Sequence, residues 1–228
     1  MTLTYFGHSC FLANFDGTRV LFDPFISPNG LAKDVNVAAI EADYIFLSHG
    51  HYDHVADVEA IGLRTGAELL GMFEVLGYFE AKGLKANLKM NLGGRVQLPF
   101  GQVQMVGAAH SSSLPDGSYG GLAAGFVIKT AAGRTLYFAG DTALTYDMKL
   151  IGERYGRLDF AILPVGDHFT MGVSDALICA DWVGTSKIIG MHFDTFPPLV
   201  INHDVAKAEA QAAGKELLLL RVGETITL

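Results

Sequence analysis

The chain has 228 residues, of which 50% are hydrophobic and 18% are charged, and its formal net charge is −8. This composition can bury a large core and is unlike that of a disordered protein. A nucleic-acid partner is not expected, because Lys and Arg form no basic cluster that would offset the negative charge. The sequence shows neither the roughly 18–20 apolar residues of a membrane span nor the pattern of a signal peptide. We therefore expect a cytoplasmic protein without a membrane partner.

The first half of the chain alternates short apolar segments with turn residues, a pattern typical of strands interleaved with helices. We expect strands over 2–6, Cys10–Phe15 and Thr18–Phe22, and then over 44–48, 67–70, 87–90, 95–98 and 102–108. We expect helices within 34–42 and over 57–64 and 72–82, the last of which ends at Gly83.

The second half continues the alternation. We expect strands over 122–130, 134–139, 158–164, 187–191, 216–220 and 225–228, and helices over 146–155, 174–183 and 204–213. Cys10 and Cys179 lie far apart and are expected to be buried free thiols. No linker or repeat divides the chain, so the pattern predicts one α/β (or α+β) domain over residues 1–228, with two packed sheets and helices outside them.

The stretch His49-Gly50-His51-Tyr52-Asp53-His54 directly follows the apolar strand expected over 44–48. Imidazole and carboxylate groups are the side chains that bind zinc, manganese or iron(II). A lone histidine is usually structural, but a cluster of such side chains at the end of a buried strand is not explained in that way. The stretch therefore predicts a metal site.

Further side chains of this kind follow other expected strands, namely His8, Asp23, His110, Asp141 and His192. Each has an ordinary interpretation when it is taken alone. His8 can be a turn residue, Asp23 can be good turn chemistry before a proline, and Asp141 can cap a helix. Beside the first cluster, His110 becomes a candidate ligand of the same site.

The spacing H-x-H-x-D-H after a strand resembles the signature of the metallo-β-lactamase superfamily. The resemblance covers nearly the whole chain, through Gly7-His8-Ser9, Asp23-Pro24-Phe25, His110-Ser111-Ser112-Ser113, Gly140-Asp141-Thr142, Phe169-Thr170-Met171-Gly172 and Met191-His192-Phe193. Together these blocks are similar to the small, single-domain branch of bacterial and archaeal metal-dependent hydrolases whose substrate is unassigned. The resemblance implies a four-layer αββα sandwich with the ligands on loops at one edge.

The resemblance also implies a set of metal ligands and a reaction. One divalent ion would be held by His49, His51 and His110. The second would be held by Asp53, His54 and His192, and both would be bridged by Asp141. Zinc is the favoured metal, with manganese or iron as alternatives. The two ions would share a hydroxide that attacks an ester, lactone or phosphodiester bond.

Three residues are candidates for catalysis beside the metal ions. Asp53 could orient the attacking water or accept its proton. His8 faces the metal site in the resembled family, which implies that it supports a ligand or the substrate. His168 stands where relatives often carry Asn, and it could contact the substrate, donate a proton to a leaving group or be merely tolerated.

Two other functions remain open on the sequence, a mononuclear iron-dependent redox enzyme of the same fold and a non-catalytic metal-binding protein. His51 argues against the di-iron reductases of the superfamily, in which an acidic residue typically takes its place. The intact ligand set argues against a non-catalytic protein. We expect a small-molecule substrate of open identity, and a homo-oligomer is compatible with the sequence.

Overall fold

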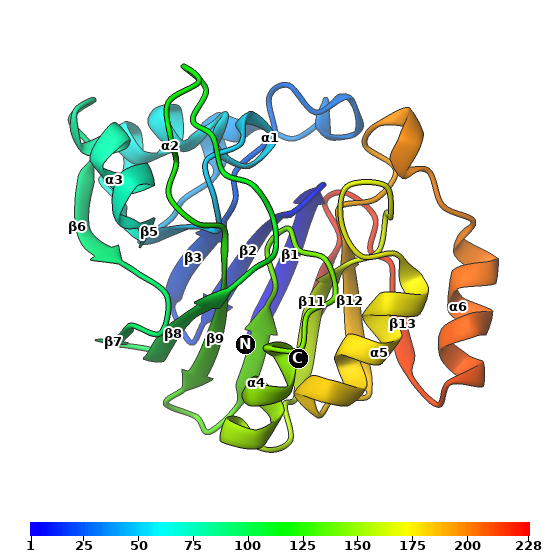
Figure 1. Ribbon diagram of the computed structural model, residues 1–228. Coiled ribbons are helices and arrows are strands. Elements are labelled where there is room, and N and C mark those ends of the chain that lie inside the picture. The colour runs from blue at the N-terminus through cyan, green and yellow to red at the C-terminus, as the bar shows by residue number, and fades with distance from the viewer.

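Two seven-stranded sheets face each other in the computed structural model, which describes residues 1–228, and helices cover their outer faces (Figure 1). The first sheet consists, in spatial order, of β14 (Thr225–Thr227), β1 (Thr2–Gly7), β2 (Cys10–Phe15), β3 (Thr18–Phe22), β4 (Tyr44–Leu47), β5 (Glu68–Met72) and β6 (Lys85–Met90). The second consists of β13 (Glu216–Leu218), β12 (Lys187–Met191), β11 (Phe160–Pro164), β10 (Thr135–Phe138), β9 (Ala124–Thr130), β8 (Gly101–Gly107) and β7 (Arg95–Leu98). This arrangement confirms the predicted αββα sandwich.

The helices fall into two groups that follow the two halves of the chain. The first half carries α1 (Tyr52–Val55), α2 (Val58–Thr65) and α3 (Phe73–Glu80), and the second half carries α4 (Met148–Tyr155), α5 (Val173–Val183) and α6 (His203–Ala212). Single 3-10 turns occur at η1 (Gly30–Ala32), η2 (Val37–Ala39) and η3 (Pro197–Leu199). None of these helices combines the length and hydrophobicity that crossing a bilayer requires.

The short helix expected within 34–42 is a single 3-10 turn. The segment 34–42 holds only the 3-10 turn η2, which the Asn36 side chain caps by accepting a hydrogen bond from the Ala38 N–H. Ile40 has already returned to an extended conformation, so the helix cannot continue. The capping side chain and the apolar residues around it suggested a helix, but they stabilise one turn and no more.

The core lies between the two sheets and joins them. One continuous cluster of 64 buried residues includes side chains from both sheets. Phe22 of β3 stacks on Phe138 of β10 with ring centroids 4.7 Å apart, and Phe46 of β4 meets Phe126 of β9 at 5.4 Å. Each such buried ring contributes about 1.5–3 kcal/mol of hydrophobic stabilisation, so the two sheets are held firmly against each other.

The strands that precede the candidate ligands run in the same direction and end at one edge of the sandwich. In the first sheet β3 and β4 are parallel, and β1 runs with them because β1 and β3 are both antiparallel to β2. In the second sheet β10, β11 and β12 are parallel, and β8 runs with them because β8 and β10 are both antiparallel to β9. The loops after β1, β3, β4, β8, β10 and β12 therefore share an edge.

Backbone hydrogen bonds connect the two sheets at this edge. The N–H of His192, after β12, donates to the carbonyl of His8, after β1, at 2.8 Å. The N–H of Ala124 in β9 donates to the carbonyl of Ser48, after β4, at 2.9 Å. The loops of the two sheets are thus brought within contact of each other.

Candidate metal centre

The predicted metal motif begins where β4 ends, but it is not a loop throughout. His49 and Gly50 are extended, and α1 starts at Tyr52, with His51 in the position before its first turn. Gly50 packs against the loop after β8, where an added Cβ would meet the Ser113 carbonyl at 3.0 Å. A strand followed at once by a helical turn sends the motif's side chains in different directions, which separates them into two groups.

The first group consists of His49, His51 and His110. Its ligand atoms all lie within 4.8 Å of one another. The resemblance implies that these three residues hold one ion, and that assignment stays a prediction. His49 Nε2 lies 2.9 Å from His51 Nδ1, so His51 faces the group through Nδ1. The other nitrogen of His51 lies 3.4 Å from the Ser111 hydroxyl.

The second group consists of His8, Asp53, His54 and His192, whose ligand atoms also lie within 4.8 Å of one another. The sequence predicted Asp53, His54 and His192 for the second ion and His8 for a place beside it. His8 instead lies within the group, with Nε2 3.1 Å from Asp53 Oδ2 and its ring 4.2 Å from that of His192.

Asp141 lies between the two groups. Its Oδ2 is 2.9 Å from His192 Nε2, 3.2 Å from His54 Nε2 and 3.6 Å from His110 Nε2. The alternative interpretation as a helix cap does not apply, because α4 begins at Met148 and Asp147 precedes it. One carboxylate oxygen therefore meets histidines of both groups.

Asp23 and Ser48 support two of the histidines from behind. Asp23 Oδ2 lies 2.9 Å from His54 Nδ1 and accepts a 2.6 Å hydrogen bond from the Ser48 hydroxyl. Ser48 Oγ in turn lies 3.0 Å from His49 Nδ1. These contacts occupy the Nδ1 atoms and orient both rings so that Nε2 faces the centre. Asp23 adopts this position with a φ of 42°, a left-handed conformation that few residues other than glycine accept.

His8 is fully buried and is held from both ends of its ring. Nδ1 lies 3.0 Å from the Thr195 hydroxyl, opposite the contact of Nε2 with Asp53. Burial lowers the pKa of His8 to about 4, so its ring is neutral near pH 7.

His168 is not brought to the centre. Its side chain is exposed on the loop after β11 and packs edge-on against Phe169, with ring centroids 4.4 Å apart. None of the groups of candidate ligand atoms includes it. Its suggested contact with the substrate or the leaving group stays a prediction.

The electrostatics of the buried groups match the needs of metal ligands. Burial holds the pKa of His49 well below its usual range, which leaves a neutral imidazole with a free electron pair. Burial would raise the pKa of Asp141, but the nearby His54 and His192 hold it well below its usual range. Asp141 is therefore a carboxylate, the form that binds a cation.

Two observations show that a cation fits this site. His54 Nε2 and Asp141 Oδ1 are buried and have no hydrogen-bond partner, although such atoms are rarely left unpaired. Burial lowers the pKa of His54, yet Asp141 and Asp23 together raise it well above its usual range, because two negative charges flank one ring. Ligand atoms around a tetrahedral zinc ion lie about 3.4 Å apart, close to the separations found around Asp141 Oδ2. The residues present fit a metal.

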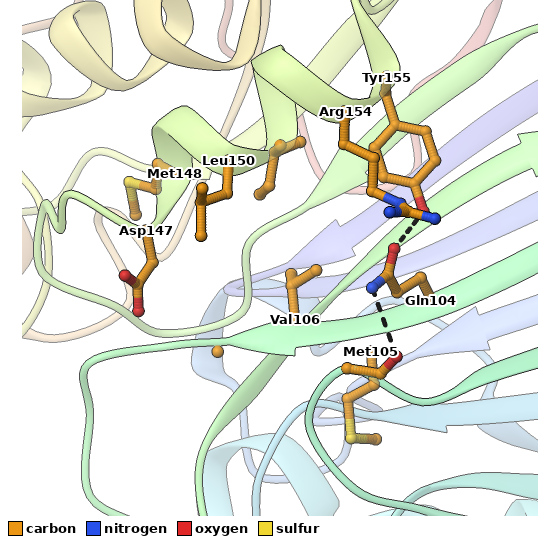
Figure 2. Close-up of a pocket in the computed structure, with 11 residues that line it drawn as sticks. Gln104, Met105, Val106, Asp147, Met148, Leu150, Arg154 and Tyr155 are labelled. Atoms are coloured by element: carbon orange, nitrogen blue, oxygen red, sulfur yellow. Dashed lines mark hydrogen bonds between the residues drawn. The ribbon is translucent and has the colours of Figure 1, made fainter.

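A separate cavity lies away from this centre. It measures about 240 Å³ and is bounded by α4 and β8, where Gln104 accepts a hydrogen bond from Tyr155 (Figure 2). Its lining residues include none of the predicted metal ligands. The candidate centre is instead a group of converging polar atoms whose opening is marked by Asp53, with 29% of its side chain exposed.

Sequence reasoning missed part of the support around the centre. Ser48 precedes the motif directly, and its place in the chain was the one available signal. Thr195 and Asp57 carried no signal, because their partners come from distant segments. Asp57 accepts hydrogen bonds from the backbone N–H groups of Ile26 (2.6 Å) and Ser27 (2.9 Å), which fastens the loop after Asp23. His203 lies 2.7 Å from the Asp194 carboxylate, and 42% of its side chain is exposed.

Known proteins resemble this chain in sequence and in fold. Residues 18–193 match the model of the beta-lactamase superfamily domain. A UPF0173 metal-dependent hydrolase of Christiangramia forsetii is 47% identical over 229 residues that cover both chains entirely. A second such protein, from Thermus thermophilus, is 41% identical and covers 98% of this chain and 97% of its own.

Solved structures agree with these relatives. A metallo hydrolase from the archaeon Ignicoccus hospitalis superposes with a TM-score of 0.89 at 33% identity, over 100% of this chain and 97% of its own. An isothiocyanate hydrolase from gut bacteria of Delia radicum superposes with a TM-score of 0.78 at 19% identity, over 100% and 99% of the chains, and shows the shared fold alone. The chain therefore belongs to the beta-lactamase superfamily and, within it, to the UPF0173 family of metal-dependent hydrolases.

Proposed function

We propose that this chain is a binuclear hydrolase. His49, His51 and His110 would hold one ion, Asp53, His54 and His192 would hold the other, and Asp141 would serve both. The observation that carries this proposal is the position of Asp141 Oδ2, which lies within 3.6 Å of imidazole nitrogens from both groups. Zinc is the favoured metal, since nitrogen and carboxylate ligands suit it well, and manganese and iron are the alternatives.

Two divalent ions, when bound, supply a water activated at neutral pH and polarise the bond to be cleaved. The protein supplies the proton acceptor. Burial would raise the pKa of Asp53, but the hydrogen bond from His8 and the charge of His54 hold it below its usual range. Asp53 is thus an ionised carboxylate at the opening of the site, where it orients the attacking water and takes up its proton.

His8 acts as a positioning residue in this proposal. In the neutral tautomer that carries its proton on Nε2, His8 donates to Asp53 Oδ2, and its Nδ1 lies 3.0 Å from the Thr195 hydroxyl. This pair of contacts fixes the Asp53 carboxylate from the side that faces away from solvent. The bond cleaved is an ester, lactone or phosphodiester.

The first experiment is the metal content of the purified protein by plasma mass spectrometry, beside a panel of ester, lactone and phosphodiester substrates. About two zinc or manganese ions per chain, with hydrolysis that a chelator abolishes, would support the proposal. One iron ion per chain without hydrolysis would replace it with the redox enzyme. No bound metal after reconstitution would contradict the metal centre itself.

A further inference from the structure

Three aromatic side chains stand beside the proposed centre, Phe25, Tyr52 and Phe196, and we refer to them as the aromatic wall. Phe25 lies in the middle, with ring centroids 6.1 Å from Tyr52 and 6.2 Å from Phe196. Phe25 is buried, at 3% exposure, whereas Tyr52 is 56% exposed and Phe196 is 37% exposed. A large apolar surface open to water is unfavourable unless something covers it.

The aromatic wall is continuous with the site. Phe25 and Phe196 both pack edge-on against the His8 ring, at 5.5 and 5.6 Å. His8 contacts Asp53, and Tyr52 directly precedes Asp53 in α1. The exposed rings therefore begin where the Asp53 carboxylate reaches solvent, at the place where a substrate would enter.

The charges around the centre disfavour an anionic substrate. Asp23, Asp53 and Asp141 lie at the centre, and no Lys or Arg forms an ion pair with any of them. The ion pairs of the basic side chains are made elsewhere, with Glu41, Asp43, Glu59, Glu80, Asp181 and Glu216. A phosphodiester would find no basic side chain here, and the two divalent ions would leave little net positive charge to attract it, because the three carboxylates and a hydroxide would offset their charge. A neutral ester or lactone needs no such attraction.

We propose that the substrate is an uncharged ester or lactone whose apolar or aromatic group packs against the exposed rings of Tyr52 and Phe196, over the buried Phe25. This inference rests on the proposed hydrolase function and narrows it to one substrate class. The occupant of the aromatic wall is the part of the substrate that is not cleaved, and its burial supplies binding energy and specificity.

The test uses two metal-binding probes that differ only in their apolar group, acetohydroxamate and benzohydroxamate, titrated calorimetrically into the zinc-loaded protein. We expect benzohydroxamate to bind about tenfold more tightly, as burial of part of a phenyl ring would give. In the double variant Tyr52→Ala/Phe196→Ala this ratio should fall to near unity, with metal content and acetohydroxamate binding unchanged. Tyr146→Ala, which removes an exposed ring of another segment (72% exposed), is the matched control and should keep the ratio.

Other results would overturn the inference in distinguishable ways. Equal binding of the two probes by the wild-type protein would contradict the role of the aromatic wall in substrate binding. It would leave the hydrolase proposal intact. Failure of both probes to bind the zinc-loaded protein contradicts the hydrolase proposal and this inference together. Faster cleavage of bis(4-nitrophenyl) phosphate than of 4-nitrophenyl hexanoate overturns the substrate class alone. If the double variant does not fold, Tyr52→Ser alone changes an exposed side chain and should halve the ratio or reduce it further.

Discussion

The two sheets contribute to the proposed centre in different ways. On the side of the first sheet, the polar side chains hold one another: Asp23 contacts His54, Ser48 contacts His49, and His8 contacts Asp53. On the side of the second sheet, His110, Asp141 and His192 come from three separate loops. Asp141 Oδ1 and His192 Nδ1 have no hydrogen-bond partner, and His110 meets Asp141 only at 3.6 Å.

This difference indicates how the centre is assembled. Side chains that are already oriented lose little freedom when a ligand binds, whereas unsupported side chains must be ordered by the ligand itself. The first sheet therefore presents a preformed half of the site, and the second sheet presents a half that a cation completes. Each of the following predictions tests that contrast.

Removal of the Asp141 carboxylate should have the largest effect. We expect Asp141→Ala to lose both ions and all hydrolysis, because one side chain serves both groups and no neighbour can replace it. Plasma mass spectrometry of the purified variant measures the metal content. Asp147→Ala, an exposed carboxylate before α4, is the control and should keep the wild-type content. Two ions per chain in Asp141→Ala would contradict the bridging role.

Weakening the preformed half should lower metal affinity without loss of the fold. Asp23→Asn keeps the size of the side chain and tolerates the left-handed backbone at this position, but it removes the charge behind His54. We expect the metal dissociation constant to rise about 10–100-fold, measured by competition with a chromophoric chelator. Ser48→Ala removes the contact with His49 and one hydrogen bond to Asp23 but keeps the Asp23 charge behind His54, so it should have a smaller effect. A larger effect from Ser48→Ala would show that Asp23 is not the centre of this support.

Removal of the metal should increase the mobility of the ligand-bearing loops of the second sheet more than that of the loops of the first sheet. A chelator should lower the melting temperature by about 5–10 °C, the shift expected when an ion bound at a hundred times its dissociation constant is lost. Hydrogen exchange should accelerate in the loops around His110, Asp141 and His192 and change little around His49. Equal acceleration in the loops of both sheets would remove the contrast between the two halves.

The smallest effect is expected at Asp57, which fastens the loop after Asp23. Asp57→Asn replaces one of the carboxylate oxygens that accept hydrogen bonds from Ser27 and the Ile26 N–H. We expect a loss of about 1–3 kcal/mol in the free energy of unfolding, measured by urea denaturation. Asp116→Asn is the control, since Asp116 also accepts two hydrogen bonds but lies on an exposed loop. It should leave the stability unchanged, and an equal loss there would point to a general effect of the substitution.

Much of the fold could be predicted because local patterns carry it. The apolar runs before His49, Asp141 and His192 were identified as strands and are strands β4, β10 and β12. The segment 34–42 was the exception, because one capping residue and a few apolar neighbours are compatible with a single turn as well as with a helix. The placement of ligand-type side chains at strand ends followed from the same patterns.

The contacts between these side chains could not be predicted in the same way. His8 lies within the group of Asp53, His54 and His192, although 45 residues separate it from Asp53. Thr195 and Ser48 contact histidines through single hydrogen bonds that depend on the positions of whole loops. A distance of about 3 Å between two side chains is set by the packing of both sheets, which no local pattern records.

The sequence by itself determined the family, the strand order along the chain and the residue types able to bind a metal, because spacing and hydrophobic alternation are local properties. The tertiary structure alone decided that the strands before the candidate ligands end at one edge, that Asp141 lies between the two groups of histidines and that an exposed aromatic wall adjoins Asp53. These features depend on parallel pairing and on contact between sheets, which bring together residues that are far apart in the chain.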